Sequence, residues 1–107
     1  MDTKFEEALT ELHRSIVSDY ERKNLDGFRV VEFAESIQFE EGRKYLKVTK
    51  KLGTQTMVWG FIMKEDDKKF KKGDILKAAS WSAPARNKAR GNIFEEYDVR
   101  WTGPNYL

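Results

Sequence analysis

The segment from Thr56 to Met63 is apolar at nearly every position, so it would present apolar side chains on both faces of a β-strand. A half-exposed strand alternates apolar and polar residues, and an unbroken apolar run therefore predicts a central strand that is covered on both faces. Gly60 interrupts the run, and a glycine inside a strand indicates a sharp coil where a sheet bends to close. The remainder of the 107 residues must cover both faces of this strand.

The N-terminal residues supply one of these covering layers. Their apolar residues recur at intervals of three and four, which places them on one stripe of an α-helix. Thr3 and Glu6 have the spacing of a capping box, and Gly27 is suited to end a helix. We predict a helix over residues 1–24 whose buried stripe consists of Phe5, Ala8, Leu9, Leu12, Ile16 and Tyr20.

Beyond Gly27 the apolar spacing predicts strands. Residues 28–39 have alternating apolar positions that change phase, which predicts an extended segment with a bulge near Val30–Val31 or Glu35–Ser36. Residues 64–72 are polar apart from Phe70, which is their only large apolar anchor, and they predict a solvated loop. Further strands are predicted over residues 43–51, 56–63, 75–81 and 93–101.

A long loop separates the last two predicted strands. Residues 82–92 contain a proline and a glycine but no large apolar residue, and loops of this length in small domains are often functional. No repeat or linker divides the chain. We predict a single α+β domain over residues 1–107. In it, the helix over 1–24 is followed by residues 28–107, which form a strongly bent five-stranded antiparallel sheet or a small barrel with the basic loop 82–92.

Composition excludes several classes of protein. The chain has no cysteine, which excludes disulfides, thiolate metal sites and cysteine nucleophiles. Its aromatic fraction of 13% is too high for a disordered chain. The acidic N-terminus does not resemble a signal peptide, and no run approaches the roughly 20 apolar residues of a membrane span. We expect a cytoplasmic protein without membrane contact.

The net charge of +2 hides a separation along the chain. Residues 1–42 hold eleven acidic and five basic residues, a net charge of −6, whereas residues 43–107 hold fifteen basic and seven acidic residues, a net charge of +8. Such an asymmetry indicates contact with nucleic acid or an acidic partner. The alternative is that the oppositely charged elements lie against each other within the fold or across a subunit contact.

The strongest basic segment lies between Asp74 and Glu95, where no acidic residue occurs. Cations at alternate loop positions suit a phosphate backbone, backbone N–H groups near Gly91 suit an anion nest, and a tryptophan can stack on a base. The alternative is that the loop is merely solvated and that Trp81 packs in the core. The predicted nucleic-acid or phosphate contacts are Lys77, Trp81, Arg86, Lys88, Arg90 and Asn92.

The remaining polar residues do not form a catalytic or metal-binding motif. His13 is the only histidine and is expected at the surface, and the acidic run from Glu65 to Asp67 lacks the spacing of a calcium loop. A third reading is an enzyme that joins Glu95 or Asp98 to the basic loop. No phosphate-binding loop, nucleophile elbow or zinc-protease motif supports it. We therefore expect that the protein is not an enzyme and that it binds no metal and no cofactor.

The order of one helix and about five antiparallel strands resembles the Sm-like and other small SH3-type barrels. That resemblance implies a barrel whose copies are joined into a ring through their edge strands. Proteins of the Sm group bind RNA, but the last predicted strand here carries Glu96-Tyr97-Asp98 in place of their basic or histidine-containing run. The resemblance is therefore one of topology.

A second resemblance covers roughly the last third of the chain. The segments Gly73 to Trp81, Ala85 to Ile93 and Trp101 to Leu107 resemble a pattern in small uncharacterised proteins of tailed phages, including marine ones. It implies a viral or environmental source, and thus a host cytoplasm, without implying an activity. We expect a non-enzymatic protein that acts by self-association as a homo-oligomer or by partner binding. The alternative is an RNA- or single-stranded-DNA-binding module that uses the basic 77–90 surface.

Overall fold

The computed structural model describes residues 3–23 and 27–104. No helix in these two ranges is both long and apolar enough to cross a membrane. The elements in chain order are α1 (Thr3–Lys23), α2 (Gly27–Ser36), β1 (Gln38–Glu41), β2 (Tyr45–Leu52), β3 (Gln55–Met63), β4 (Ile75–Leu76), β5 (Val99–Arg100) and β6 (Gly103–Pro104).

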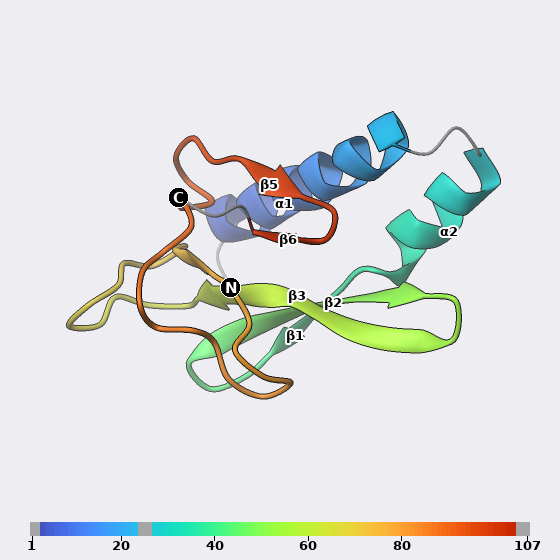
Figure 1. Ribbon diagram of the computed structural model, residues 1–107. Coiled ribbons are helices and arrows are strands. Elements are labelled where there is room, and N and C mark those ends of the chain that lie inside the picture. Colours follow the sequence, from blue (N-terminus) through green and yellow to red (C-terminus); the bar gives the residue numbers. More distant parts are fainter. Residues whose placement is uncertain (1–2, 24–26, 105–107) are drawn as a thin grey trace.

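Both helices and the small β5–β6 sheet lie on one face of a four-stranded antiparallel sheet (Figure 1). The strand order is β1-β2-β3-β4, and β5 pairs only with β6. The α+β class is confirmed, and of the two predicted alternatives the open sheet is correct because the strands do not close into a barrel. Of the last predicted strand, over residues 93–101, only Val99–Arg100 forms a strand, β5, and it is not part of the main sheet.

The predicted extended segment after Gly27 is a helix, α2, and the bulges predicted within it are wrong. Val30 and Phe33 are buried while Val31 is 57% exposed, as helical spacing requires and strand alternation does not. The Phe33 ring stacks on Tyr20 of α1 with a centroid distance of 4.2 Å. Packing against α1 thus overrides the strand propensity of this Val- and Phe-rich segment.

Strand β3 has neighbours on both sides, β2 and β4, which confirms it as a central strand. Val48 pairs with Gly60 but Thr49 pairs with Val58, so Trp59 is the extra residue of a bulge. A Cβ atom on Gly60 would lie 2.9 Å from the carbonyl oxygen of Leu76. The strand is thus irregular at Trp59, next to Gly60, and the approach of Leu76 leaves no room for a side chain at Gly60, but the sheet does not bend to close as predicted.

Separate clusters cover the two faces of the sheet. The helix-facing cluster joins the α1 stripe and α2 to sheet residues such as Val48 and Ile62. The opposite cluster consists of four buried residues, Phe61, Met63, Phe70 and Leu76. Phe70 belongs to the polar loop and is 4% exposed, which confirms it as the anchor of that loop. From Trp59 to Met63 the apolar run of β3 is buried because this loop covers its second face, whereas Thr56 and Met57, at the start of the predicted run, are exposed.

Strand β4 is much shorter than the predicted strand over 75–81. Its outer side is occupied by the end of the basic loop, since Ile75 donates a backbone hydrogen bond to Gly91 and accepts one from Arg90. Gly91 has a φ of +147°, and a Cβ atom there would lie 2.8 Å from Cβ of Tyr97. Residues 82–92 form no helix or strand, as predicted. Backbone hydrogen bonds from Ala85 to Lys77 and from Arg90 to Ile75 fix the loop to the chain at and after β4, while Asn87 and Lys88 between them are exposed.

Candidate binding surface

Arg86 of the basic loop is fixed by three groups of the same chain. Its Nη2 donates to Oδ2 of Asp67 at 2.7 Å, and its Nη1 donates to the Tyr45 hydroxyl at 2.6 Å. The guanidinium also lies 4.8 Å from the centroid of the Phe70 ring. The Asp67 carboxylate raises the pKa of Arg86 further. These contacts direct Arg86 towards the protein itself.

Arg90 and Asn92 are buried, with exposed fractions of 5% and 7%. The amide of Asn92 donates to the Lys72 carbonyl at 2.9 Å and to Oδ1 of Asp74 at 3.0 Å. Its carbonyl oxygen accepts the backbone N–H of Phe94 at 2.8 Å. Asn92 thus joins the end of the basic loop to the turn before β4.

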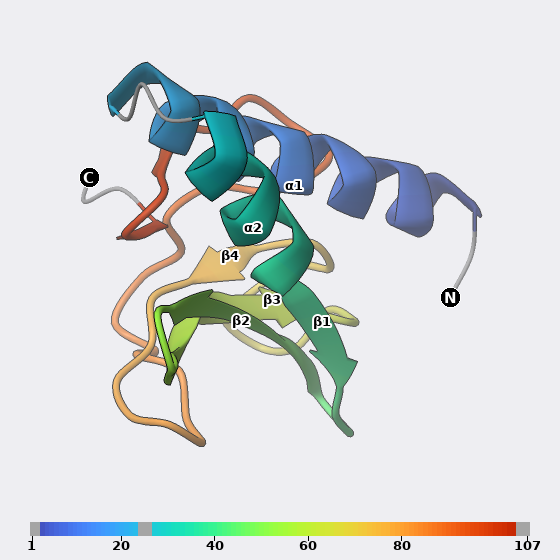
Figure 2. The same ribbon diagram turned by 90° about the vertical axis from the view of Figure 1, so that its right-hand side faces the viewer.

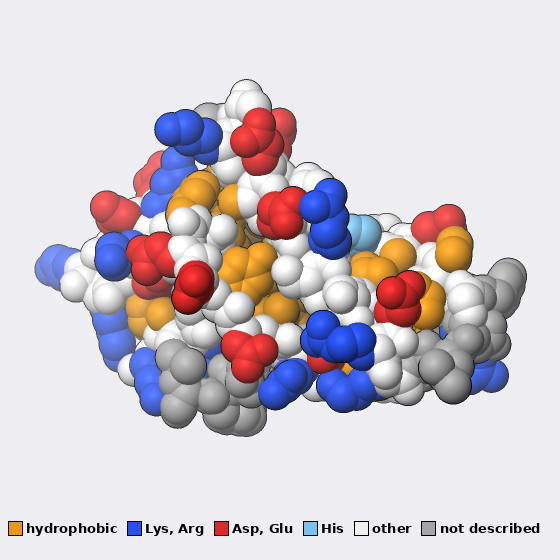
Figure 3. Space-filling model, turned by 90° about the horizontal axis from the view of Figure 1, so that it is seen from above, with side chains coloured by type: hydrophobic (Ala, Val, Ile, Leu, Met, Phe, Trp, Pro, Cys, Tyr) orange, Lys and Arg blue, Asp and Glu red, His pale blue; other side chains and the backbone are white. Residues whose placement is uncertain are grey.

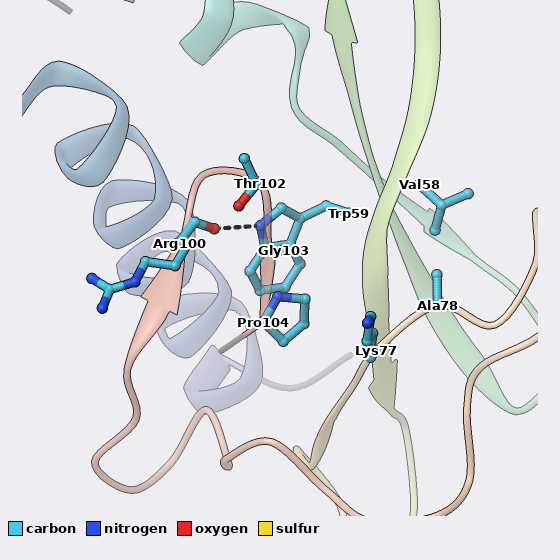
Figure 4. Close-up of a pocket in the computed structure, with 8 residues that line it drawn as sticks. All are labelled: Val58, Trp59, Lys77, Ala78, Arg100, Thr102, Gly103 and Pro104. Atoms are coloured by element: carbon cyan, nitrogen blue, oxygen red, sulfur yellow. Dashed lines mark hydrogen bonds between the residues drawn. The ribbon is translucent and has the colours of Figure 1, made fainter. Parts of the chain in front are cut away.

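The two predicted lysines lie elsewhere. Lys88 is exposed, while Lys77 is half-buried and lines a pocket of about 330 Å³ with Trp59 and Pro104. Figure 4 shows the side chain of Arg100 pointing away from this pocket, while its carbonyl oxygen accepts the Trp59 Nε1–H at 2.8 Å. The structure therefore does not bring the predicted cations together on one surface.

The sequence pattern did not indicate that Asp67 is the centre of this region. Its carboxylate accepts the backbone N–H groups of Phe70 and Lys69 at 2.7 and 2.8 Å, besides the bond from Arg86 and an ion pair with Lys44 at 3.1 Å. The two backbone hydrogen bonds, followed by the bond from Arg86, hold the pKa of Asp67 well below its usual range. Asp67 thus connects the polar loop over residues 64–72 to the basic loop and to the residue before β2.

We expect Asp67→Asn to lower the melting temperature at pH 7 more than Glu65→Gln does. Both changes convert an acid of the same loop to its amide, but only the first removes charge-assisted bonds to backbone and to Arg86. Because the folded-state pKa of Asp67 is lowered, the stabilisation is present at neutral pH and is lost as the pH falls through the unfolded and then the folded value. Thermal melts of both variants at pH 7 and pH 3 check this. Equal melting temperatures at pH 7 would contradict it.

Trp81 is 54% exposed, so the alternative that placed it in the core is wrong. Nζ of Lys47 lies 4.4 Å from the centroid of the indole, which holds the ring above the sheet by a cation–π contact. The ring forms one wall of a pocket of about 440 Å³ where the C-terminal end of α2 meets β1 and β2, which we call the Trp81 pocket. The other residues that line it are polar: Glu35, Ser36, Gln38, Glu40, Thr49, Lys51 and Thr56.

The Trp81 pocket adjoins the free edge of the sheet. Gln38 and Glu40 belong to β1, which pairs with β2 on one side and has no strand on the other within the described part of the chain. Figure 2 shows β1 at the outer border of the sheet, below the C-terminal end of α2. An aromatic wall and an unpaired strand edge thus lie side by side, a combination that no residue pattern indicated.

The charge separation along the chain is partly compensated inside the fold. Lys64 pairs with Glu41 at 2.7 Å, and Arg100 lies 3.9 Å from Asp19. Acidic and basic side chains are interspersed on the face seen in Figure 3.

His13, expected at the surface, is half-buried and its Nε2 lies 2.8 Å from the Ala34 carbonyl oxygen, so it joins α1 to α2.

No group of three or more His, Cys, Asp or Glu residues within 3–23 and 27–104 is arranged to hold a metal ion. Comparison with known proteins finds no match among curated proteins and none among solved structures. A family model matches residues 2–105, nearly the whole chain. The chain therefore belongs to a family of unknown function, DUF7717.

Proposed function

We propose that the protein is a non-enzymatic binding protein that associates with another chain through the Trp81 pocket. The observation that carries the proposal is the exposure of Trp81, because a large aromatic ring that is held in place but left open to solvent is typical of interface anchors. The ring is held by Lys47, so little of its freedom remains to be lost on binding. The origin in a tailed phage, and with it a host cytoplasm, stays a prediction.

The geometry supports nucleic-acid binding through the basic loop less well. Phosphate contact needs cations that converge on a backbone, but Arg86 is directed to Asp67 and Arg90 is buried. Lys88 remains at the surface of the loop. Binding of single-stranded RNA or DNA at low salt that survives Trp81→Ala but is lost in Lys88→Ala would favour this alternative over the proposal.

Trp81→Ala tests the proposal, with Phe94→Ala as the matched control because Phe94 is 46% exposed on another part of the surface. Peptides are selected against the wild-type protein from a random displayed library, and sedimentation velocity between 5 and ~200 μM measures self-association. We expect Trp81→Ala to weaken the selected peptides, or a dimer of the protein, by at least about tenfold, because truncating an interface tryptophan commonly costs ~2 kcal/mol. We expect Phe94→Ala to leave the same affinities unchanged.

A protein that stays monomeric and yields no selected peptide would overturn the proposal. So would binding that Trp81→Ala and Phe94→Ala weaken equally, because the contact would then not lie at the Trp81 pocket. Far-UV circular dichroism of both variants establishes that each is folded.

A further inference from the structure

We infer that the partner presents an extended, basic peptide segment that adds as a new strand to the free edge of β1 and places a Lys or Arg side chain in the Trp81 pocket. This inference rests on the proposed function and narrows it to one recognition mode. Three features of the described residues support it: the unpaired edge, the charge around that edge, and the position of the pocket beside it.

The backbone of β1 offers hydrogen bonds to a further strand. In an antiparallel ladder, alternate residues turn their N–H and C=O groups away from the paired neighbour. The partner strand β2 takes up one side of Gln38 to Glu41, and no described strand lies on the other. By contrast, the opposite border of the sheet is closed, because Gly91 and Arg90 hydrogen-bond to Ile75 of β4. Strand addition is therefore available at β1.

The charge beside this edge selects the partner. The segment from Val30 to Gly42, which leads into β1 and forms it, holds four glutamates and no Lys or Arg, and the glutamates are Glu32, Glu35, Glu40 and Glu41. Glu41 is already paired with Lys64 at 2.7 Å, so Glu35 and Glu40 are the acids that a partner meets beside the pocket. Two copies of β1 paired with each other would bring carboxylates against carboxylates, which is destabilising across a strand pair. A basic segment is attracted, whereas a second copy of this edge is repelled.

The pocket gives a basic side chain a place to bind. Phe39 of β1 packs with the helix-facing core, so its neighbours Gln38 and Glu40 face the other side, where they line the Trp81 pocket. Side chains of an added strand opposite them point to that same side. A cationic group there meets Glu40 and Glu35, although Lys51 lines the pocket and Lys47 already lies over the indole, and both lysines limit the gain.

Binding is measured by calorimetry at moderate salt with a capped heptapeptide of alternating valine and lysine. Two matched peptides serve as controls, one with glutamate in place of lysine and one with every backbone amide N-methylated. We expect the lysine peptide to bind at least about tenfold more tightly than either control, because charge and backbone donors are both needed. We also expect its binding to shift the backbone amide NMR signals of residues 38–41.

Glu40→Lys is the decisive variant, and Glu65→Lys is its control because it makes the same charge change in the loop over residues 64–72. Glu40→Lys is expected to reverse the preference between the two charged peptides, and Glu65→Lys to leave it unchanged. If Glu40→Lys does not fold, the milder variant Glu40→Gln replaces it, and we expect Glu40→Gln to weaken the binding of the lysine peptide. The inference is overturned if the wild-type protein binds the glutamate peptide, or the N-methylated peptide, as tightly as the lysine peptide.

The two proposals fail in different ways. Library peptides that require Trp81 but are acidic or helical, or a dimer that Trp81→Ala dissociates, would overturn the basic-strand inference and leave the proposed function standing. If no peptide binds, no dimer forms and Trp81→Ala changes nothing, both are overturned.

Discussion

Asp19→Ala is expected to lower the free energy of unfolding at pH 7 by about 3 kcal/mol, because it leaves a donor inside the fold without its charged acceptor. The carboxylate is 1% exposed and accepts the backbone N–H of Trp101 at 2.8 Å. It also accepts from Lys23 at 2.9 Å and Arg22 at 3.1 Å within α1. One side chain thus ties the C-terminal part of α1 to the β5–β6 segment, 82 residues away in the sequence.

Glu11→Ala is the matched control for this change. Glu11 lies on the same helix and pairs with Arg14, but both side chains are mostly exposed, so its loss is expected to cost less than about 0.5 kcal/mol. Urea unfolding of the two variants measures the difference. Equal losses would show that Asp19 contributes no more than a surface carboxylate.

The contribution of Asp19 also predicts a pH dependence. Burial raises the pKa of Asp19, but the hydrogen bonds from Trp101, Lys23 and Arg22 outweigh it, and the net pKa is lowered. A carboxyl with a lowered folded-state pKa stabilises the fold above its unfolded pKa, and that stability is lost as the pH falls through the folded value. We expect the wild type to lose stability in acid more steeply than Asp19→Asn does.

Stability is expected to rise by about 3 kcal/mol between pH 7.5 and pH 10.5 because of Lys50, which is 2% exposed. Burial lowers the pKa of Lys50 from 10.5 to about 8. Below pH 8 Lys50 is charged in both the folded and the unfolded state, so the folded state is destabilised by the cost of burying the charge. Between pH 8 and 10.5 the unfolded chain keeps the proton that the folded chain has released, so the folded state becomes favoured.

Lys50→Met removes the titrating group while keeping a long side chain, and Lys51→Met is the control on the neighbouring, exposed position. We expect the rise with pH to disappear in Lys50→Met and to persist in Lys51→Met, as measured by urea unfolding at intervals of half a pH unit. Parallel profiles for the wild type and Lys50→Met would contradict the assignment. Nζ of Lys50 donates to the Trp101 carbonyl at 2.8 Å, so the same segment that Asp19 holds is held from the sheet side as well.

In the sequence, Asp19 and Lys50 stand out only as charged residues at positions where the pattern predicts apolar ones. Asp19 follows Ile16 by three positions and lies beside Tyr20, so it falls on the buried stripe of the helix. Lys50 is in phase with Leu46 and Val48, the inward residues of its strand. A charged residue on a buried face must find a partner, but the pattern does not say which. The partner of both, Trp101, lies far along the chain.

Local patterns also failed where two structures were compatible with the same residues. Val30, Phe33 and Ile37 have helical spacing, while Val31, Phe33 and Ile37 are also compatible with a bent strand. The stacking of Phe33 on Tyr20 favours the helix. The basic loop shows the same limit, since the alternation of its cations predicted a common surface, whereas Asp67 and the backbone of Ile75 draw Arg86 and Arg90 inward.

The sequence by itself determined the first helix, the central strand, the strand before it, the anchoring role of Phe70 and the α+β class. These features depend on periodicity, which is a local property. Only the tertiary structure decided that α2 is a helix, that the sheet stays open at β1 and that Trp81 is left exposed beside that edge. Those outcomes depend on which distant side chains fill each face and border of the sheet, and contacts of that kind are not encoded in local spacing.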